Sequence, residues 1–359
     1  MNRQNDTLVP RHILVTGGAG FIGANFARWV ARRYPTTHIT VFDALTYAGK
    51  RDNLAGIPDD ALTFVRGDIC DADAVDAVLR PAPANAYESG RTPPAVDAIV
   101  HFAAESHNDN AIADAAPFLR TNVMGTYTLL EAARRYDIRF HHISTDEVYG
   151  DLPLDGVERF NEDSAYRPSS PYAASKAASD HLVRAWHRTY GVRATISNCS
   201  NNYGPYQHVE KFIPRQITNI LCGLRPKLYG DGHAIRDWIN VEDHCSAIWA
   251  VLTRGTIGRT YVIGTDGEMS NAQVLRAILR AMDRPGDDFE HVTDRPGADR
   301  RYALDAARIT AELGWHPRHA DFEQGLESTI RWYVDHPQWW RGDKAVTERR
   351  YARQTGERS

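Results

Sequence analysis

The sequence predicts an α/β fold: a doubly wound parallel sheet with helices on both faces, followed by a smaller mixed domain. Short apolar runs alternate with segments of helical periodicity from residue 12 to residue 198. This alternation is typical of strand–helix–strand units, whose strands pair in parallel. Beyond Tyr203 the rhythm becomes irregular, and prolines and glycines such as Pro205, Pro214 and Gly230 become frequent. That change indicates a second domain.

Each predicted element has its own pattern. Residues 12–16 are an apolar run that ends in glycines, and residues 21–33 repeat apolar side chains at helical spacing. In chain order the further predicted strands are 39–42, 63–66, 98–102, 140–144 and 194–198, and the further helices are 72–79, 116–136 and 171–190. The stretch 81–94, rich in proline and alanine, is predicted to be a surface loop, and the charged tail after Trp340 a helix or a frayed end.

The composition excludes several classes of protein. The chain has 359 residues, 42% of them hydrophobic, and a net charge of −4, so nucleic acid is not an expected partner. It contains no apolar run long enough for a membrane span or a secretion signal, so a cytoplasmic protein is expected. Its four cysteines form no CxxC pair and its histidines form no ligand pattern, so we expect reduced thiols and no metal.

A glycine-rich turn separates the first strand from the first helix. It reads Gly17-Gly18-Ala19-Gly20-Phe21-Ile22-Gly23, and its glycines permit a tight turn and a close approach to a pyrophosphate. Asp43 ends the second strand, where a carboxylate can bind ribose hydroxyls and repel a 2′-phosphate. These features predict a Rossmann-like domain that binds NAD rather than NADP, the alternative being a glycine turn without a ligand. Because no Gly-Lys-Ser/Thr follows, a P-loop is excluded.

Tyr172 and Lys176 lie four residues apart at the start of a predicted helix, so their side chains share one face. An ammonium near a phenol favours the phenolate and is expected to lower the pKa of Tyr172. Such a tyrosine can act as the base on an alcohol while hydride leaves to NAD+. The alternative is a surface Tyr and Lys on an amphipathic helix.

Two adjacent acids, Asp146 and Glu147, follow Thr145 at the end of the fifth predicted strand. Ligands of α/β sheets bind outside the carboxyl ends of the strands, so these acids should arrive near Tyr172. Neighbouring carboxyls in a partly dry site tend to separate their pKa values, which leaves one protonated and one ionised. Such a pair suits the elimination of water, and a solvated Asp-Glu turn is the alternative.

At these motifs the chain resembles the bacterial dTDP-glucose 4,6-dehydratases of the extended short-chain dehydrogenase/reductase superfamily. The resemblance runs from about Arg11 to Trp340 and includes stretches around Gly67-Asp68-Ile69, Ala103 to His107, Cys199 to Tyr206, Tyr229 to Gly232, Arg236 to Trp238 and Arg295 to Gly297. The Thr145-Asp146-Glu147 triplet is the discriminating piece, because related 4-epimerases lack the acid pair.

The resemblance implies a mechanism for dTDP-glucose. Tyr172, assisted by Lys176, would take the proton of the 4-hydroxyl while hydride passes from C4 to NAD+, and Thr145 would hold the 4-oxygen. Glu147 would then remove the C5 proton and Asp146 would protonate the departing 6-hydroxyl. Hydride then returns to C6 and C5 is reprotonated, so the net change is loss of water and NAD is regenerated.

The resemblance also implies binding residues. Those expected to contact NAD are Gly17, Gly20, Phe21, Ile22, Gly23, Asp43, Ala44, Leu45, Thr46, Asp68, Ile69, Phe102, Ala103, Ala104, Glu105, Thr121, Tyr172, Lys176 and Asn202. Those expected to contact the sugar nucleotide are Ser106, Thr145, Asn201, Lys211, Phe212, Lys227, Leu228, Tyr229, Arg236, Asn271, Asp294, Arg295, Pro296, Gly297 and Tyr302. Arg236 is the expected diphosphate clamp, since a guanidinium binds phosphate oxygens bidentately; an ion pair with Asp237 is its alternative.

The chain departs from the family pattern in three places. Residues 108–110 read Asn-Asp-Asn where many members have Val-Asp-Arg, and Ala298 stands where the family usually has His. An alanine cannot hydrogen-bond the nucleotide, so affinity or base preference is expected to differ. The 81–94 loop is longer than usual and has no assigned role.

Other activities compete with a dehydratase on the sequence alone. Another NAD-dependent sugar-nucleotide enzyme, such as an epimerase, a decarboxylase or a dehydratase for a different nucleotide, would share most motifs. A catalytically silent dinucleotide-binding regulator would not need the acid pair.

The resemblance sets the expected organisation. It implies an NAD-binding domain at 1–203, with a returning segment near 236–263, and a mainly sugar-nucleotide-binding domain at 204–359. It further implies a homodimer that pairs helices 116–136 and 171–190 with their mates, and a product that commonly feeds dTDP-L-rhamnose synthesis.

Overall fold

The structure is a computed structural model that describes residues 7–80, 94–294 and 299–355. Its centre is a seven-stranded sheet in the order β10-β6-β5-β4-β1-β2-β3, with every neighbouring pair parallel. The strands are β1 (His12–Thr16), β2 (His38–Asp43), β3 (Leu62–Arg66), β4 (Ala98–His101), β5 (Arg139–Thr145), β6 (Ala194–Cys199) and β10 (Thr260–Ile263). The predicted α/β class with a parallel sheet is therefore confirmed.

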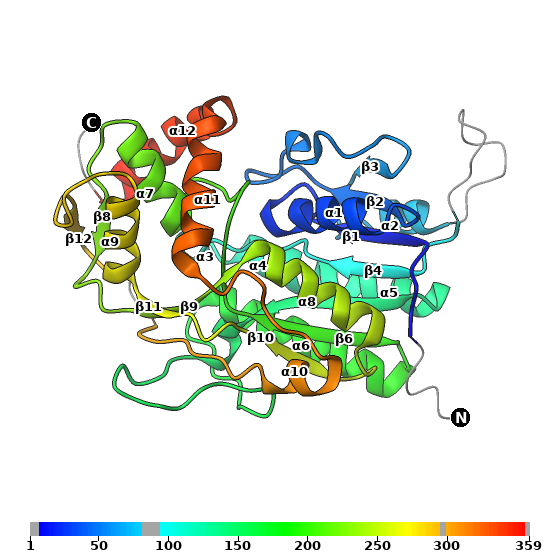
Figure 1. Cartoon of the computed structure of the whole chain (residues 1–359). Helices are drawn as coiled ribbons and strands as arrows, with labels where there is room; N and C mark the ends of the chain where they lie inside the picture. The colour runs from blue at the N-terminus through cyan, green and yellow to red at the C-terminus, as the bar shows by residue number, and fades with distance from the viewer. Residues whose placement is uncertain (1–6, 81–93, 295–298, 356–359) are drawn as a thin grey trace.

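Helices cover both faces of this sheet (Figure 1). On one face α1 (Phe21–Arg33) and α8 (Val241–Arg254) pack together over an apolar core that includes Ile13, Phe26 and Trp249. On the other face α2 (Ala72–Leu79), α5 (Thr126–Tyr136) and α6 (Pro171–Tyr190) enclose a second core. The two cores cover the two faces of the sheet and leave its carboxyl edge free for a site.

Strand order reverses at β1, which lies between β2 and β4. The chain runs from β1 outward through β2 to β3, then returns to β4 on the other side of β1. A crevice forms at such a switch point, outside the carboxyl ends of the strands. The glycine turn after β1 and the acid pair after β5 both lie at this edge.

Most of the remaining helices and strands gather at this end of the sheet (Figure 1). The small sheet β11-β9-β7 packs with four helices around a core that contains Trp238, Ile278 and Tyr333, and a second small sheet, β12-β8, packs against one of these helices through Leu228 and Leu275. These strands are β7 (Asn201–Tyr203), β8 (Lys227–Tyr229), β9 (Ile235–Asn240), β11 (Glu268–Ser270) and β12 (Glu290–Val292), and the helices are α7 (Phe212–Leu221), α9 (Asn271–Ala281), α11 (Phe322–Asp335) and α12 (Pro337–Thr355). A further helix, α10 (Ala307–Leu313), packs against β10 and α8.

One predicted helix differs from the structure. Residues 116–136 form α4 (Ala116–Phe118), a π-helical stretch η2 (Leu119–Gly125) and α5 in succession, not one α-helix. Within the stretch, the carbonyl oxygen of Asn122 accepts hydrogen bonds of 2.6 Å from both Thr126 Oγ1 and Ser179 Oγ. In a regular α-helix the Asn122 carbonyl would accept a backbone N–H, and here the two side-chain hydroxyls donate to it instead. π-helical turns of this kind often lie at functional sites. The prediction of one uninterrupted α-helix is therefore wrong.

Among the residues that the structure describes, no helix is both long and apolar enough to cross a bilayer. Within the same ranges, no group of three or more His, Cys, Asp or Glu side chains is arranged to hold a metal ion.

Candidate active site

A cavity of about 340 Å³ opens at the carboxyl edge of the sheet, at the switch point beside β1. The glycine turn forms one end of it, and the Thr145 to Glu147 segment and the start of α6 form the other. The loop after β4 and the segment from Asn201 to Lys211 close its sides. One cavity thus collects the three motifs that lie far apart in the sequence.

The glycine turn is shaped for a close approach by a ligand. Gly17 has a φ of +67°, and a Cβ on it would lie 2.5 Å from the backbone nitrogen of Ala103. A Cβ on Gly23 would lie 2.4 Å from the carbonyl oxygen of Gly17. Larger residues would therefore push the turn away from the helix and fill the cradle at the N-terminus of α1, where a pyrophosphate fits.

Asp43 holds this cradle together. Its Oδ2 accepts a hydrogen bond of 2.9 Å from the backbone N–H of Ala19, and its Oδ1 accepts one of 2.8 Å from that of Leu45. Burial raises the pKa of Asp43, and the two backbone hydrogen bonds oppose that rise. A carboxylate at the tip of β2 with further lone pairs facing the cavity suits the two hydroxyls of a ribose.

Lys176 lies under the end of β5. Its ammonium donates a hydrogen bond of 2.7 Å to the carbonyl oxygen of Ile143 and lies 3.4 Å from His142 Nε2. Burial lowers the pKa of Lys176 to about 8, although Asp180 opposes the shift. The ammonium is consequently fixed in place beside the cavity and is fully buried from solvent.

Tyr172 lies one helical turn before Lys176 and lines the same cavity. Its pKa in the polypeptide is raised well above the usual value, first by burial and then by the negative charge of Glu147. In the polypeptide, burial and the charge of Glu147 therefore outweigh the lowering expected from Lys176. The positive nicotinamide ring of bound NAD+, the second charge expected to favour the phenolate, would act in the same direction as Lys176.

The two acids after β5 occupy different surroundings. Asp146 is only 2% exposed, and burial together with the neighbouring Glu147 raises its pKa well above the usual range. Its Oδ1 accepts a hydrogen bond of 3.1 Å from Thr145 Oγ1, while Oδ2 has no partner among the described residues. Glu147 is half-buried, and its burial-raised pKa is opposed by a hydrogen bond from Asn108 and by Arg236 and Lys211. The arrangement favours a protonated Asp146 beside an ionised Glu147.

Comparisons with known proteins agree with this geometry. Residues 14–329 match the model of the family described as GDP-mannose 4,6 dehydratase. The dTDP-glucose 4,6-dehydratase of Mycobacterium tuberculosis is 59% identical over 94% of this chain and 98% of its own length. The Escherichia coli dTDP-glucose 4,6-dehydratase 1 is 46% identical over 91% of this chain and 94% of its own length.

The chain belongs to the dTDP-glucose 4,6-dehydratase family. Solved structures of this family superpose closely on it. The Streptomyces venezuelae enzyme, crystallised with NAD, has a TM-score of 0.85, 46% identity, and coverage of 92% of this chain and 99% of its own. The Bacillus anthracis enzyme in complex with NAD has a TM-score of 0.82, 43% identity, and coverage of 92% and 99%. The resemblance inferred from the motifs is confirmed.

Most residues that the family resemblance singled out line the cavity. All five residues expected to be catalytic do so, as does nearly every expected NAD contact. The expected site residues on the cavity wall are Gly17, Gly20, Phe21, Ile22, Gly23, Asp43, Ala44, Thr46, Asp68, Ile69, Phe102, Ala103, Ala104, Glu105, Ser106, Thr121, Thr145, Asp146, Glu147, Tyr172, Lys176, Asn201, Asn202 and Lys211. The glycine cradle and this wall fit the family's cofactor, NAD.

Other expected residues lie outside the cavity wall. Phe212 and Leu228 pack in apolar cores, Lys227 pairs with Glu290, and Tyr229 accepts a hydrogen bond of 3.1 Å from Arg215. Leu45, Asn271 and Asp294 are also off the wall, and Arg295, Pro296 and Gly297 lie outside the described residues, as does Ala298.

Arg236 and Tyr302 form a separate group next to the acid pair. The guanidinium of Arg236 lies 4.4 Å from the centre of the Tyr302 ring and donates to the carbonyl oxygens of Ile235 and Asp299, at 2.7 and 2.8 Å. It does not pair with Asp237, whose carboxylate accepts hydrogen bonds from the Thr265–Gly267 turn. Its positive charge acts on both Asp146 and Glu147, so it lies close to the reacting end of the cavity.

Several wall residues were not anticipated from the sequence. They are Phe42, Ala48, Gly49, Gly67, Ile143, Ser144, Cys199, Ser200, Gln207, His208 and Glu210. Most are neighbours of expected residues, so the motifs could have been extended to include them. Asn108 is different, because only its contact with Glu147 across 39 residues reveals its place in the site.

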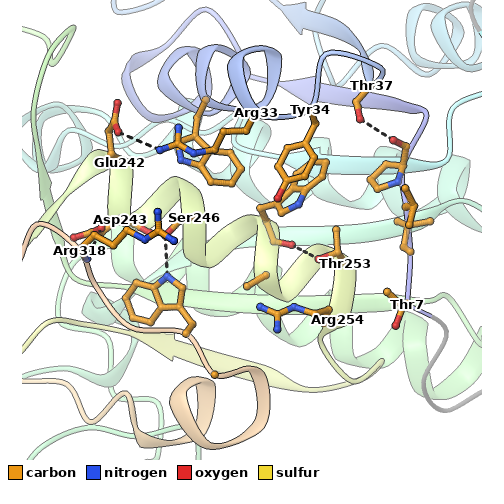
Figure 2. Close-up of a pocket in the computed structure, with 18 of the residues that line it drawn as sticks. Thr7, Arg33, Tyr34, Thr37, Glu242, Asp243, Ser246, Thr253, Arg254 and Arg318 are labelled. Carbon is orange, nitrogen blue, oxygen red and sulfur yellow. Dashed lines mark hydrogen bonds and ion pairs between the residues drawn. The ribbon is translucent and has the colours of Figure 1, made fainter.

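A second hollow, of about 540 Å³, lies over α1 and α8, between the segment before β1 and the segment after α10 (Figure 2). Its walls include Tyr34 stacked on Trp249 at 4.2 Å, and Trp315, whose indole donates to Ser246. Glu242 pairs with Arg32, and Asp243 accepts from the backbone N–H of Arg318. These charged and polar groups already have partners within the protein, and none of the catalytic motifs faces this hollow.

Proposed function

We propose that the chain converts dTDP-glucose to dTDP-4-keto-6-deoxy-glucose by eliminating water across C5 and C6. It is an NAD-dependent hydro-lyase, as are the family members to which it is similar. The single observation that carries the proposal is the presence of Tyr172, Asp146 and Glu147 on the wall of one cavity. A phenol and two carboxyls of different pKa can together serve three proton transfers on one hexose.

In the first step Tyr172 takes the proton of the 4-hydroxyl. Thr145, which accepts the backbone N–H of Glu147 and donates to Asp146, would hold the 4-oxygen. Lys176 stabilises the phenolate by charge from its fixed place under β5. NAD, which the glycine turn and Asp43 would hold, would supply the temporary acceptor for the C4 hydride and the hydride for C6, with a proton returned to C5.

In the second step the two acids act on C5 and C6. The ketone at C4 acidifies the C5 proton, and Glu147, the half-buried carboxylate, removes it. Asp146, buried and protonated, donates its proton to the departing 6-hydroxyl, which leaves as water. Each carboxyl thus has the protonation state that its task requires.

Epimerases offer the main alternative, since their fold is similar. UDP-glucose 4-epimerase from Thermus thermophilus, crystallised with NAD, superposes with a TM-score of 0.79 at 29% identity, covering 90% of this chain and 99% of its own. An epimerase has no need of an acid that protonates a leaving hydroxyl. A silent regulator has no need of the acid pair at all, so the Asp146–Glu147 geometry favours the dehydratase.

Incubating the purified protein with dTDP-glucose in heavy water tests the proposal. Mass spectrometry should show loss of one water and gain of one solvent deuterium at C5. Conversion to dTDP-galactose would favour an epimerase, and recovery of unchanged dTDP-glucose by protein that retains NAD would favour a regulator. Parallel incubation with GDP- and UDP-sugars tests the choice of nucleotide.

The remaining binding roles follow from position. We assign the NAD contacts to the glycine cradle, Asp43 and the wall along β4, and the sugar nucleotide to the side of the cavity near Asn201 and Lys211. Arg236 remains the proposed diphosphate clamp, since its guanidinium is held rigidly near the acid pair. On this basis residues 1–203 with the 236–263 segment form the NAD-binding domain, and 204–359 mainly bind the sugar nucleotide.

We also propose that the chain acts as a homodimer. Leu119, Met124 and Tyr127, on η2 and α5, are 56%, 54% and 41% exposed, which is unusual for large apolar side chains close together on one helix. A second copy that covers this face would pair the helices expected from the family. Light scattering should give twice the chain mass, and Met124→Arg should shift it toward the monomer, whereas Leu224→Arg, at an exposed leucine elsewhere, should not.

The free cysteines Cys70, Cys199, Cys222 and Cys245 support a reducing, cytoplasmic location. A 4-keto-6-deoxy sugar nucleotide is the starting point for several deoxysugars, and we propose dTDP-L-rhamnose synthesis as the route that it feeds.

A further inference from the structure

Asn108 is the first residue of the short helix α3 (Asn108–Ala113) and contacts the proposed base directly. Its side-chain nitrogen donates a hydrogen bond of 3.0 Å to Glu147 Oε2. Among the residues that the structure describes, no other hydrogen bond to the Glu147 carboxylate is recorded. The orientation of that carboxylate therefore depends on α3, an element that carries none of the catalytic motifs.

The orientation of the Asn108 amide is itself fixed by Ser170. Ser170 Oγ accepts the backbone N–H of Ala173 and donates its own hydrogen to Asn108 Oδ1, at 3.1 and 3.2 Å. Because the amide oxygen receives this hydrogen, the NH₂ group must face Glu147. Ser170 caps the helix that presents Tyr172, so one amide joins the base carboxylate to the start of the catalytic helix.

The backbone around Asn108 is also anchored. Lys211 Nζ donates to the carbonyl oxygen of Ser106 at 2.8 Å, and Arg350, on α12, donates to Asn110 Oδ1 at 3.1 Å. The donor thus approaches Glu147 from a rigid position, which is the requirement for orienting a catalytic group.

We propose that Asn108 is a positioning residue for the elimination step, which holds the Glu147 carboxylate against the C5 proton of the substrate. The inference rests on the proposed function and adds a residue that lies outside the catalytic motifs.

The surrounding charges show what losing the donor would do. Glu147 is faced by Asp146 on its own segment, by Arg236 on β9, by Lys211 before α7, by Asp299, and by the phenols of Tyr172 and Tyr302. Arg236 and Lys211 donate hydrogen bonds to backbone carbonyls, and each acts on Glu147 through its charge. The Asn108 hydrogen bond opposes the rise that burial causes in the pKa of Glu147. Without this donor the pKa of Glu147 should rise further, which favours the protonated carboxyl, and that form cannot act as a base.

The test compares Asn108→Leu, which keeps the branched shape of the side chain and removes the donor, with Ile112→Ala as a control on the same helix. Ile112 is 47% exposed and lies off the cavity wall. For Asn108→Leu we expect kcat to fall about tenfold, while KM for dTDP-glucose stays within about twofold. The acid limb of the plot of kcat against pH should shift to higher pH by about one unit. C4 oxidation, followed by the absorbance of reduced nicotinamide in a single turnover, should keep its rate.

Asn108→Asp provides a second, isosteric variant in case the leucine disturbs the fold, which NAD content and thermal unfolding will show. Placing a carboxyl against Glu147 should move the acid limb further than Asn108→Leu does. An unchanged acid limb in both variants would overturn the inference, as would an equal loss in C4 oxidation and in C5 exchange. A wild-type protein that leaves dTDP-glucose unchanged would instead overturn the proposed function, so the two failures are distinguishable.

Discussion

At the scale of single residues, the end of β5 shows how neighbours in the sequence acquire opposite chemistry. Both acids line the cavity, but Asp146 is almost completely buried, and burial and the nearby Glu147 both favour its neutral form. Burial also raises the pKa of Glu147, but Asn108, Arg236 and Lys211 oppose that rise. The difference arises from the partners that the fold supplies, not from the identity of the two acids.

Replacing each acid separately should divide the elimination into its two proton transfers. Glu147→Gln is expected to abolish exchange of the C5 hydrogen with solvent and to lower kcat by about 10²-fold or more, because no base remains. Asp146→Asn is expected to lower kcat by a similar factor while C5 exchange continues, because the base is intact and only the leaving group lacks its acid. Deuterium incorporation into substrate and product measures both. The reverse pattern would exchange the roles assigned to the two residues.

Tyr172→Phe should stop the cycle one step earlier. Without the phenol no base takes the 4-hydroxyl proton, so the ketone that acidifies C5 does not form. We expect kcat to fall by about 10²- to 10⁴-fold and C5 exchange to fall with it, while NAD stays bound. Exchange that continues in this variant would show that another group removes the first proton.

At the scale of elements, the turn between β1 and α1 determines whether a dinucleotide can be held. Gly23 lies in the first turn of α1, where a side chain would run into the backbone of Gly17 and Gly18. The close packing of helix against strand depends on the missing side chain, as it does in other dinucleotide-binding folds.

Gly23→Ala should therefore release NAD. Its Cβ would lie 2.4 Å from the Gly17 carbonyl oxygen and 2.8 Å from the Gly18 Cα, and neither backbone atom can move without distorting the turn. The purified variant is expected to contain less than about a tenth of the wild-type NAD, a loss of at least about 1.4 kcal/mol in binding free energy. Gly342→Ala in α12 is the control, because its Cβ meets nothing within 4 Å. Normal NAD content in Gly23→Ala would contradict the role of this contact.

Elements with strong local signals could be predicted from the sequence. The segments 12–16, 21–33, 72–79 and 171–190 coincide with β1, α1, α2 and α6, since glycines, caps and periodicity mark their ends. Strands β2, β5 and β6 extend past the predicted bounds because pairing with neighbouring strands adds residues that lack a local signal. The π stretch depends on Ser179, a residue distant in sequence from Asn122, so periodicity could not reveal it.

The residues of the site likewise fall into two groups, those that the sequence could predict and those that it could not. Tyr172, Lys176 and the acid pair belong to short motifs whose chemistry is visible in the sequence. Asn108 contributes through one amide hydrogen bond to a strand end 39 residues away, and the spacing of residues gives no sign of such a contact. The placement of Arg236 over Tyr302 likewise depends on how β9 meets the segment after residue 299.

At the scale of the whole molecule, the middle of the protein contains an unusual set of buried histidines. His101, His141, His142 and His244 lie in or against the central sheet and are at most 1% exposed. Burial lowers the pKa of all four, that of His142 to about 4 and that of His244 to about 3. Burial therefore favours the neutral form of each imidazole in the folded protein.

This arrangement makes stability depend on pH. An unfolded histidine has a pKa near 6.5, so below that value the unfolded chain binds protons that the folded protein does not. From pH 7 to pH 5.5 each of the four should lower the free energy of unfolding by about 1 kcal/mol. Buried acids with raised pKa values, such as Asp146 and Asp237, shift stability in the opposite direction, so the net change alone does not isolate the histidines.

A comparison of variants at two pH values does isolate them. His101, whose ring bonds Thr16 and Thr126 at 2.8 and 3.0 Å, can be replaced by glutamine, which does not titrate. His101→Gln should be less stable than the wild type at pH 7, and its deficit should shrink by about 1 kcal/mol at pH 5.5, because only the wild type loses stability through this residue. Urea unfolding at both pH values measures the deficit, with His316→Gln at an exposed position as the control. A deficit that stays constant would mean that His101 is protonated to the same extent in the folded and unfolded protein, and burial would then not set the acid limit of this fold.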